Sequence, residues 1–305
     1  MAISRVRAKL NGTWSNLTKN ASTGKWSASL TAPAATSYNQ TGRYYPITVE
    51  VTNDAGTVKL YETTDTQFGA TLKLVVKEKT KPVITLVSPS AGAHVANNKQ
   101  PVTFKVTDET GGSGVNLSEV KLKVDSTTIA YNGTGMSHTA ITNGYQFVYT
   151  PSAALADGSH TITINAKDND GNAATAVSST MIIDTTPPTL AITAPNNNLK
   201  TNNPALTVRG TTNDATSSPV IVTVKLNSGA AVAVTVGSDG TFSKALTLTE
   251  GINTITVVAK DGVGKTTTVT RTVALDTSIP AVTSIVLSKN PASVSESITI
   301  TVEVE

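Results

Sequence analysis

Two stretches of nearly the same pattern decide the fold of this chain: Thr161-Ile-Thr-Ile-Asn-Ala-Lys-Asp-Asn-Asp-Gly-Asn172 and Thr254-Ile-Thr-Val-Val-Ala-Lys-Asp-Gly-Val-Gly-Lys265. In each, polar residues alternate with isoleucine or valine before a turn that contains aspartate and glycine. A period of two places apolar side chains on one face of a strand, and Asp, Asn and Gly tolerate the backbone of a tight turn. Each stretch therefore predicts a strand, a hairpin turn and the start of an antiparallel strand.

The same order of features recurs along the chain. Asp168 and Asp261, which open the two turns, are 93 residues apart, and the junctions Asp184-Thr-Thr-Pro-Pro188 and Asp276-Thr-Ser-Ile-Pro280 repeat at an offset of 92. A weaker copy of the strand and turn lies upstream at residues 47–56. Because proline cannot donate a hydrogen bond to a strand ladder, we expect the junctions to separate one sheet from the next.

These repeats divide the chain into predicted domains at residues 1–80, 81–185 and 186–277, with a partial unit at 278–305. The third domain alone contains seven short strand candidates, at 189–193, 205–210, 220–227, 231–236, 241–248, 253–260 and 266–275. Seven short antiparallel strands in about 90 residues are typical of an immunoglobulin-like sandwich. We therefore predict an all-β protein of tandem immunoglobulin-like β-sandwich domains in an elongated array.

The composition excludes several classes of protein. With 53 threonines among 305 residues, the chain favours strands over helices. It has no cysteine, so it has neither a disulfide framework nor a thiolate nucleophile or ligand. No apolar run approaches the roughly 20 residues of a membrane span, and a net charge of +3 is too small to indicate nucleic-acid binding. We expect no membrane insertion and no nucleic-acid partner.

No stretch predicts catalysis or a bound metal. An EF-hand loop opening at Asp168 would need a bidentate Glu at its twelfth position, which is Ser179, so a hairpin turn is the favoured interpretation. The adjacent Asp108 and Glu109 would point to opposite faces of a strand, unlike a two-carboxylate glycosidase site. We expect His160 at the surface. The sequence predicts a protein that is not an enzyme and has no catalytic residue, metal site or cofactor.

The first 80 residues differ from the rest of the chain. They hold seven of the thirteen aromatic residues and carry a formal charge of +5. Aromatic and arginine side chains dominate binding hot spots, so this region is the predicted docking domain. We expect docking or glycan contacts at Tyr38, Arg43, Tyr44 and Tyr45. Trp14 and Trp26 fit strand patterns, which favours a place in the core over a platform for sugar rings.

Two motifs resemble those of bacterial Ig-like repeat domains. They are residues 250–266 with the junction 276–280, and residues 157–172 with the junction 184–188. The domains that carry them make up about two thirds of the chain. This resemblance implies the sandwich fold but no single function, because such domains serve as spacers in secreted glycosidases, adhesins, surface-layer proteins and phage tails.

The opening residues 1–12 and the stretch 37–51 resemble Ig-like proteins from the tail regions of phages and phage-derived contractile particles of Gram-positive bacteria. That resemblance implies a structural or adhesion component of a baseplate or tail fibre. Its partners would be other virion and tail proteins and host cell-surface glycans. The first residues lack the apolar centre of a secretory signal, which agrees with assembly in the host cytoplasm and a place in the virion.

Two alternatives stay open. One is a secreted stalk or adhesin on the bacterial surface, which would place the chain outside the cell. The other is an accessory module of a glycosidase. The partial unit at 278–305 adds a further expectation, because two strand-like segments alone are marginally stable and their open edges invite pairing. We expect another chain to complete this sheet, so the protein would be a homo-oligomer in its assembly.

Overall fold

The computed structural model describes all 305 residues and is almost entirely β-structure. It divides into two compact units, residues 1–183 and 184–305. The two helices are single 3-10 turns of three residues each, η1 (Thr41–Arg43) and η2 (Leu117–Glu119), and neither has the length or apolar character to cross a membrane.

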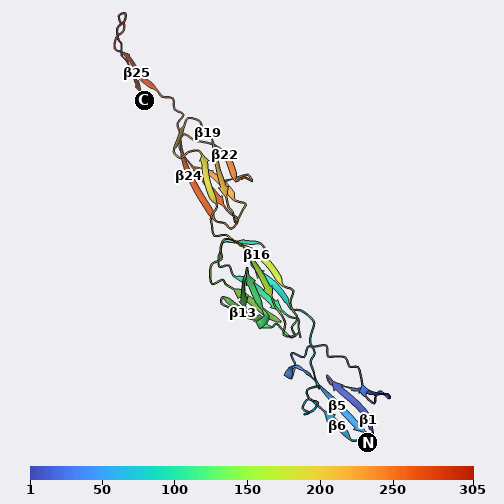
Figure 1. Ribbon diagram of the computed structural model, residues 1–305. Coiled ribbons are helices and arrows are strands. Elements are labelled where there is room, and N and C mark those ends of the chain that lie inside the picture. Colours follow the sequence, from blue (N-terminus) through green and yellow to red (C-terminus); the bar gives the residue numbers. More distant parts are fainter. The chain divides into compact units, whose positions relative to one another are not determined.

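The first sheet lies within residues 3–74 and has the strand order β2-β1-β5-β6. The short strand β7 also pairs with β5, at the start of that strand. Figure 1 shows β1, β5 and β6 side by side. The strands are β1 (Ile3–Leu10), β2 (Thr13–Asn16), β5 (Tyr45–Asn53), β6 (Val58–Tyr61) and β7 (Lys73–Leu74); β3 (Thr18–Lys19) and β4 (Trp26–Ser27) form a separate ribbon. Val6, Ala8 and Leu10 alternate into the core, as a period of two requires.

An ion-pair triad crosses this first sheet. Glu50 on β5 is buried, and its two carboxylate oxygens accept hydrogen bonds from Arg5 at 2.8 Å and Arg7 at 2.6 Å. The bond from Arg7 is the largest influence on Glu50 and helps hold the pKa of that carboxyl below its ordinary value. Part of the positive charge of the first 80 residues is therefore neutralised within the sheet.

Residues 83–183 form a sandwich of two sheets. The first has the order β13-β14-β10-β8 and the second β12-β11-β15-β16-β9. The strands are β8 (Val83–Ser88), β9 (Ala93–Val95), β10 (Val102–Thr107), β11 (Lys121–Val124), β12 (Thr127–Ala130), β13 (Met136–Ile141), β14 (Gly144–Tyr149), β15 (Gly158–Asn165) and β16 (Val177–Ile183). Fully buried Phe104 and Phe147 stack at the centre, with their ring centroids 4.9 Å apart.

Residues 189–275 form a second sandwich on the same plan. Its sheets have the orders β17-β19-β22 and β18-β24-β23-β20-β21. The strands are β17 (Thr189–Ala194), β18 (Leu199–Thr201), β19 (Ala205–Asn213), β20 (Ile221–Leu226), β21 (Val232–Val234), β22 (Thr241–Thr247), β23 (Gly251–Lys260) and β24 (Thr266–Leu275). Seven of these eight strands coincide with the predicted candidates; β18 was not predicted. The expected all-β, Ig-like sandwich fold is confirmed.

One detail of both sandwiches is a parallel strand pair. In each, a three-residue strand near the start of the domain lies parallel to the last strand: β9 beside β16 and β18 beside β24. The strand before it, β8 or β17, belongs to the opposite sheet. The opening segment of each sandwich thus contributes to both of its sheets.

The last strands, β25 (Val282–Leu287) and β26 (Ile300–Val304), pair as an antiparallel two-stranded sheet. Both predicted segments therefore form strands. Their apolar side chains are exposed, Ile285 at 65% and Val304 at 64%. Completion of this sheet by another chain stays a prediction.

Candidate functional sites

Tyr38 and Arg43, two of the predicted docking residues, form a pair beside η1. The Arg43 guanidinium carbon lies 4.3 Å from the centre of the Tyr38 ring, a distance typical of a cation–π contact. Arg43 is exposed and Tyr38 is half-buried. The Ser37 hydroxyl donates to the Arg43 carbonyl at 3.1 Å and fixes the turn. The pair therefore forms a charged and partly exposed aromatic surface.

Tyr44 and Tyr45 point to different environments. Tyr44 is half-buried, and the Lys73 ammonium lies 5.1 Å from its ring centre. Tyr45 is buried, and its hydroxyl donates to the Ala35 carbonyl at 3.2 Å. Its ring face is packed inside the domain, so Tyr45 is a core residue and cannot contribute the contact that the sequence suggested. Tyr38, Arg43 and Tyr44 retain accessible surface for that role.

The tryptophans and one histidine depart from expectation. Trp14 and Trp26 are half-buried and do not belong to the core. Trp14 is instead covered by Arg7, whose guanidinium carbon lies 4.3 Å from the ring centre. His160 was expected at the surface but is buried, with one ring nitrogen 2.8 Å from an Asp125 carboxylate oxygen. Sequence polarity around these residues did not reveal their tertiary partners.

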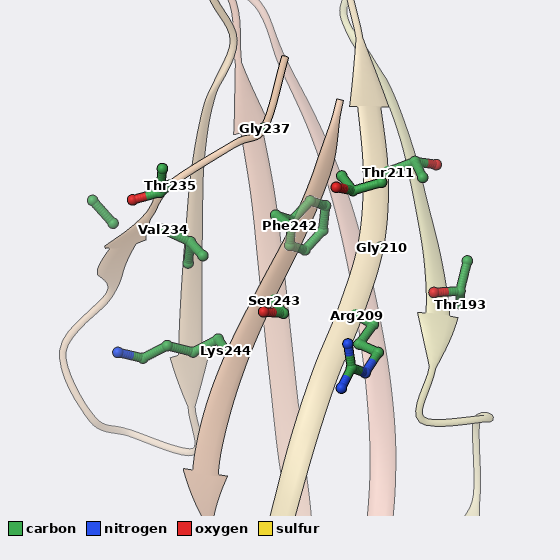
Figure 2. Close-up of a pocket in the computed structure, with 12 residues that line it drawn as sticks. Thr193, Arg209, Gly210, Thr211, Val234, Thr235, Gly237, Phe242, Ser243 and Lys244 are labelled. Atoms are coloured by element: carbon green, nitrogen blue, oxygen red, sulfur yellow. The ribbon is translucent and has the colours of Figure 1, made fainter. Parts of the chain in front are cut away.

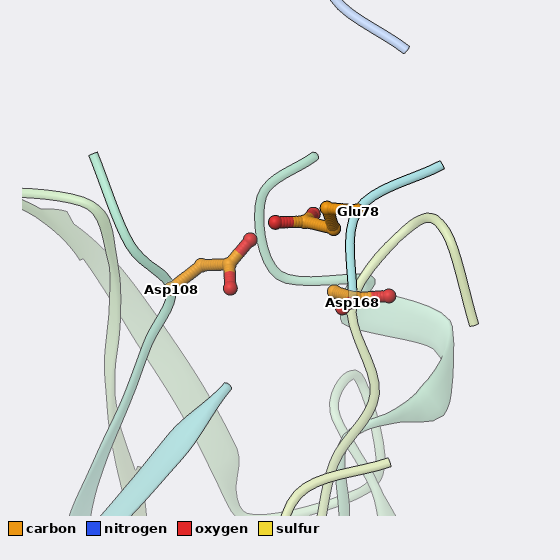
Figure 3. A group of neighbouring side chains, drawn as sticks. All are labelled: Glu78, Asp108 and Asp168. Carbon is orange, nitrogen blue, oxygen red and sulfur yellow. The ribbon is translucent and has the colours of Figure 1, made fainter. Parts of the chain in front are cut away.

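A group of three carboxylates, the first acidic cluster, lies where the chain reaches the first sandwich. It consists of Glu78 in the segment before β8, Asp108 directly after β10, and Asp168 in the turn that follows β15 (Figure 3). One carboxylate oxygen from each residue lies within 4.8 Å of the others. Asp108 and Asp168 are buried. Three distant segments thus bring negative charge to one point.

Loop backbone groups hold these three carboxylates in place. Asp108 Oδ2 accepts from the Gly114 N–H at 2.7 Å, and Asp168 Oδ1 accepts from the Asn172 N–H at 2.8 Å. Glu78 Oε1 accepts from the Ser113 N–H. Burial is the largest cause of a raised pKa at Glu78, followed by contact with the Glu109 carboxyl. The predicted hairpin turn at Asp168 is present and has a second role as part of this cluster.

The second acidic cluster has the same construction in the second unit. Asp184 precedes β17, Asp214 directly follows β19, and Asp261 directly follows β23, with oxygens again within 4.8 Å of one another. Asp261 Oδ1 accepts from the Lys265 N–H at 2.8 Å, as Asp168 does from Asn172. Asp214 Oδ1 accepts from the N–H groups of two residues in its loop.

The surroundings of the second acidic cluster disfavour the ionised form of one of its carboxylates. Asp184 is fully buried, and that burial is the main cause that raises its pKa above the ordinary value. The negative charges of Asp214 and Asp261 raise it further, whereas the bond from the Thr186 N–H to Asp184 Oδ1 opposes the shift. An ionised Asp184 is therefore costly without a positive charge nearby.

A separate groove of about 890 Å³ lies over the β19–β22 face of the second sandwich (Figure 2). Arg209 and Lys244, which line it, come from these two neighbouring strands, and Thr193, Thr235 and Ser243 supply hydroxyl groups. The one aromatic ring, Phe242, is only 4% exposed. The groove can therefore form hydrogen bonds and bind negative charge but offers no open ring for stacking.

Two family models match this chain, one in each of the two sandwich regions. Residues 82–164 match the family model of a bacterial Ig domain, and residues 188–277 match that of glucodextranase, domain B. The chain contains Ig-like domains. Each match covers less than a third of the chain, and no curated protein matches it.

Several solved structures are similar to parts of this chain. Fibronectin(III)-like modules of Clostridium thermocellum CbhA are 21% identical over 63% of this chain and 93% of theirs, with a TM-score of 0.36. The D00-D0 domain of intimin is 14% identical over 63% of this chain and 100% of its own, with a TM-score of 0.30. SGBP-B of Bacteroides ovatus, solved with a mixed-linkage heptasaccharide, is 14% identical over 94% and 66%, with a TM-score of 0.23. At these values the likeness concerns the fold alone.

Proposed function

We propose that this chain is a non-catalytic structural and adhesion component of a phage tail or phage-like particle, associated with the baseplate or a tail fibre. The supporting observation is a chain of Ig-like sandwiches preceded by a chemically distinct first sheet. Such an arrangement presents successive β-domains from one attachment region. The resemblance of residues 1–12 and 37–51 to tail-region proteins supplies the particle context.

The surface of the first region supports the proposal that the chain attaches through it. The Tyr38–Arg43 pair combines an accessible ring with an exposed guanidinium, the two side-chain types enriched at binding hot spots. Other virion proteins are the expected partners of this pair, and host-surface glycans are expected partners of the particle. Assembly in the host cytoplasm and incorporation into the virion belong to the same proposal.

The test is incorporation into particles. Antibodies against the purified chain should label intact tails in immunogold micrographs and detect the chain in gradient-purified particles. Replacing Arg43 with Ala should reduce the incorporated amount at least tenfold. Lys59→Ala is the matched control, because Lys59 also lies over a tyrosine ring, 4.8 Å from the centre of Tyr61. Detection of the chain only on the surface of uninfected cells would refute the particle role in favour of a surface stalk or adhesin.

A second candidate function is an accessory carbohydrate-binding module of a glycosidase. The specific support is the match of residues 188–277 to glucodextranase domain B, together with the polar groove in that same region. Affinity electrophoresis in gels that contain soluble glucans tests it. Retardation that is lost in Arg209→Ala but retained in Lys265→Ala, outside the groove, would favour this function; unchanged mobility in all glucans would reject it.

A further inference from the structure

The two acidic clusters occupy the same places in successive repeats. Asp184 and Asp214 each follow Glu78 and Asp108 by 106 residues, and Asp261 follows Asp168 by 93. In both repeats the carboxylates come from the segment before the first strand, the loop after the second long strand of the first sheet and the turn of the last hairpin. The arrangement is therefore a property of the repeat unit.

Unpartnered oxygens point to a missing positive ligand. Each aspartate of the second cluster uses Oδ1 to accept backbone N–H groups. The Oδ2 atoms of Asp184 and Asp261 are buried without a hydrogen-bond partner, and these side chains are 0% and 4% exposed. In the first cluster, the Oδ1 atom of Asp108 and the Oε2 atom of half-buried Glu78 also have no hydrogen-bond partner, whereas both oxygens of Asp168 accept bonds from Asn172. Buried carboxylate oxygens without partners are strongly unfavourable.

No basic side chain compensates these charges. The ion pairs of the structure lie elsewhere: Arg5 and Arg7 with Glu50, His160 with Asp125, Lys167 with Glu119, and Lys289 with Glu296. Each cluster therefore gathers three carboxylates with no lysine, arginine or histidine within ion-pair distance. A bound cation would supply the absent charge and satisfy the unpartnered oxygens together.

We propose that each acidic cluster binds one Ca²⁺ ion, so that the chain holds two. Ca²⁺ takes six to eight oxygen ligands at about 2.3–2.6 Å, which allows oxygens on one ion to lie up to about 5 Å apart. The spacing of at most 4.8 Å within each cluster fits that range. Loop carbonyls and water would complete the coordination shell, as is common at calcium sites with flexible geometry.

The ion would fasten the linker to the domain that it leads into. Glu78 belongs to the segment that precedes β8, and Asp184 to the segment that precedes β17. The other two ligands of each site lie in loops at one end of the following sandwich. Calcium would thus order these linkers in either proposed function, and the inference does not depend on the choice between them.

Binding to the full chain tests the proposal directly. After removal of metals with EDTA and dialysis, calorimetric titration should show two Ca²⁺ ions per chain, with Mg²⁺ binding at least tenfold more weakly. In ¹H–¹⁵N spectra, calcium-induced shifts should concentrate in residues 108–114, 168–172, 214–217 and 261–265. Absence of binding at 5 mM Ca²⁺, or equal binding of Mg²⁺, would overturn the calcium assignment.

Single substitutions separate the two sites. Asp168→Asn and Asp261→Asn should each reduce the stoichiometry from two ions to one, and the double variant should bind none. Asp239→Asn is the matched control: it makes the same change at an exposed turn aspartate and should still bind two. If the cluster variants bind two ions as well, the ions lie elsewhere and the proposal fails.

Proteolysis offers a readout that needs no variant. Lys77 and Lys79 flank Glu78, so trypsin can cleave on both sides of this ligand. Calcium should slow cleavage there at least fivefold relative to EDTA, whereas cleavage after Lys289, far from both clusters in the sequence, should not change. Equal rates at residues 77–79 with and without calcium would contradict ordering of the linker.

Discussion

The two sandwiches share a plan but fill it differently. The core of residues 83–183 is built around the stacked rings of Phe104 and Phe147. The core of residues 189–275 consists mainly of valine and leucine, with a single ring, Phe242. In the latter, Phe242 closes on the backbone of Gly210, where a Cβ atom would lie only 2.5 Å from the ring. Different side chains therefore satisfy one topology.

The polar loops of the two sandwiches, unlike their cores, are closely alike. The turns after β15 and β23 repeat the same bonds, with glycines at φ 96° and 95° (Gly171 and Gly264) and an aspartate that accepts the N–H four residues later. Packing alone does not require carboxylates in these loops. The comparison teaches that the repeat tolerates exchange in its core while it retains the acidic clusters, which is expected if those clusters have their own ligand.

The largest difference between the sandwiches should appear when a ring is removed. Phe147→Ala should destabilise residues 83–183 by about 3–5 kcal/mol, because it leaves a large cavity beside Phe104. Phe242→Ala should cost less in the other sandwich, since that ring has no aromatic partner. Urea unfolding followed by hydrogen exchange of peptides from each sandwich measures both values. Equal losses would show that the two cores do not differ in this respect.

A smaller effect is expected from adding a methyl group. Gly210→Ala should destabilise residues 189–275 by about 1–3 kcal/mol, because its Cβ would meet the Ala191 carbonyl oxygen at 2.4 Å as well as the Phe242 ring. The double variant with Phe242→Leu should recover part of that loss by removing one of the two clashes. Chemical denaturation of the wild type, the two single variants and the double variant gives the coupling free energy between the two positions. Strict additivity would mean that ring and glycine do not interact.

The smallest effect concerns pH. Burial alone would lower the pKa of His160, but bonds to the Ala156 carbonyl and the Asp125 carboxylate oppose it, so the pKa lies above its ordinary value of 6.5. The protonated histidine therefore stabilises residues 83–183 below pH 6.5, and this contribution disappears as the pH rises through the raised pKa. We expect at most about 1 kcal/mol, because Asp125 is partly exposed.

The other sandwich supplies the control for this pH effect. It has Asn227 and Asn253 where the first has Asp125 and His160, and the two amides bond to each other at 3.2 Å. The double variant Asp125→Asn/His160→Asn installs that neutral pair. As the pH rises from 5.5 to 8.5, hydrogen exchange should show a loss of stability in the wild-type sandwich. In the double variant, the pair at positions 125 and 160 should contribute no such loss. A slope that persists in the variant would assign the effect to other groups.

The strands were predictable because their signal is local. Alternation such as Val220 to Leu226 marks one face of one strand, and the structure places β20 there. The short strand β18 was missed because Leu199–Thr201 is too brief for a period, and its pairing with β24 depends on residues about 70 positions later. Tyr45 was misjudged for the same reason, since only tertiary packing buries its ring.

The acidic clusters were harder to predict than the strands. The loop that contains Asp168 does not reveal the cluster by itself, because the carboxylate partners of Asp168 lie 60 and 90 residues earlier, at Asp108 and Glu78. The available signal was the repetition of acidic residues at matching offsets, as in Asp108 and Asp214. A contiguous-motif search cannot find such a site, because the fold and not the spacing within one loop brings the oxygens together.

The parallel pairs β9–β16 and β18–β24 also determine how each sandwich responds to mechanical tension. A force between the start of the short strand and the end of the last strand acts along both strands, so their bridging hydrogen bonds are sheared together and must break nearly at once. The antiparallel strands β25 and β26 have their outer ends side by side, at Val282 and Val304, and the same pull would open their bonds one after another. Under load, the terminal hairpin should therefore part at low force while the sandwiches stay closed.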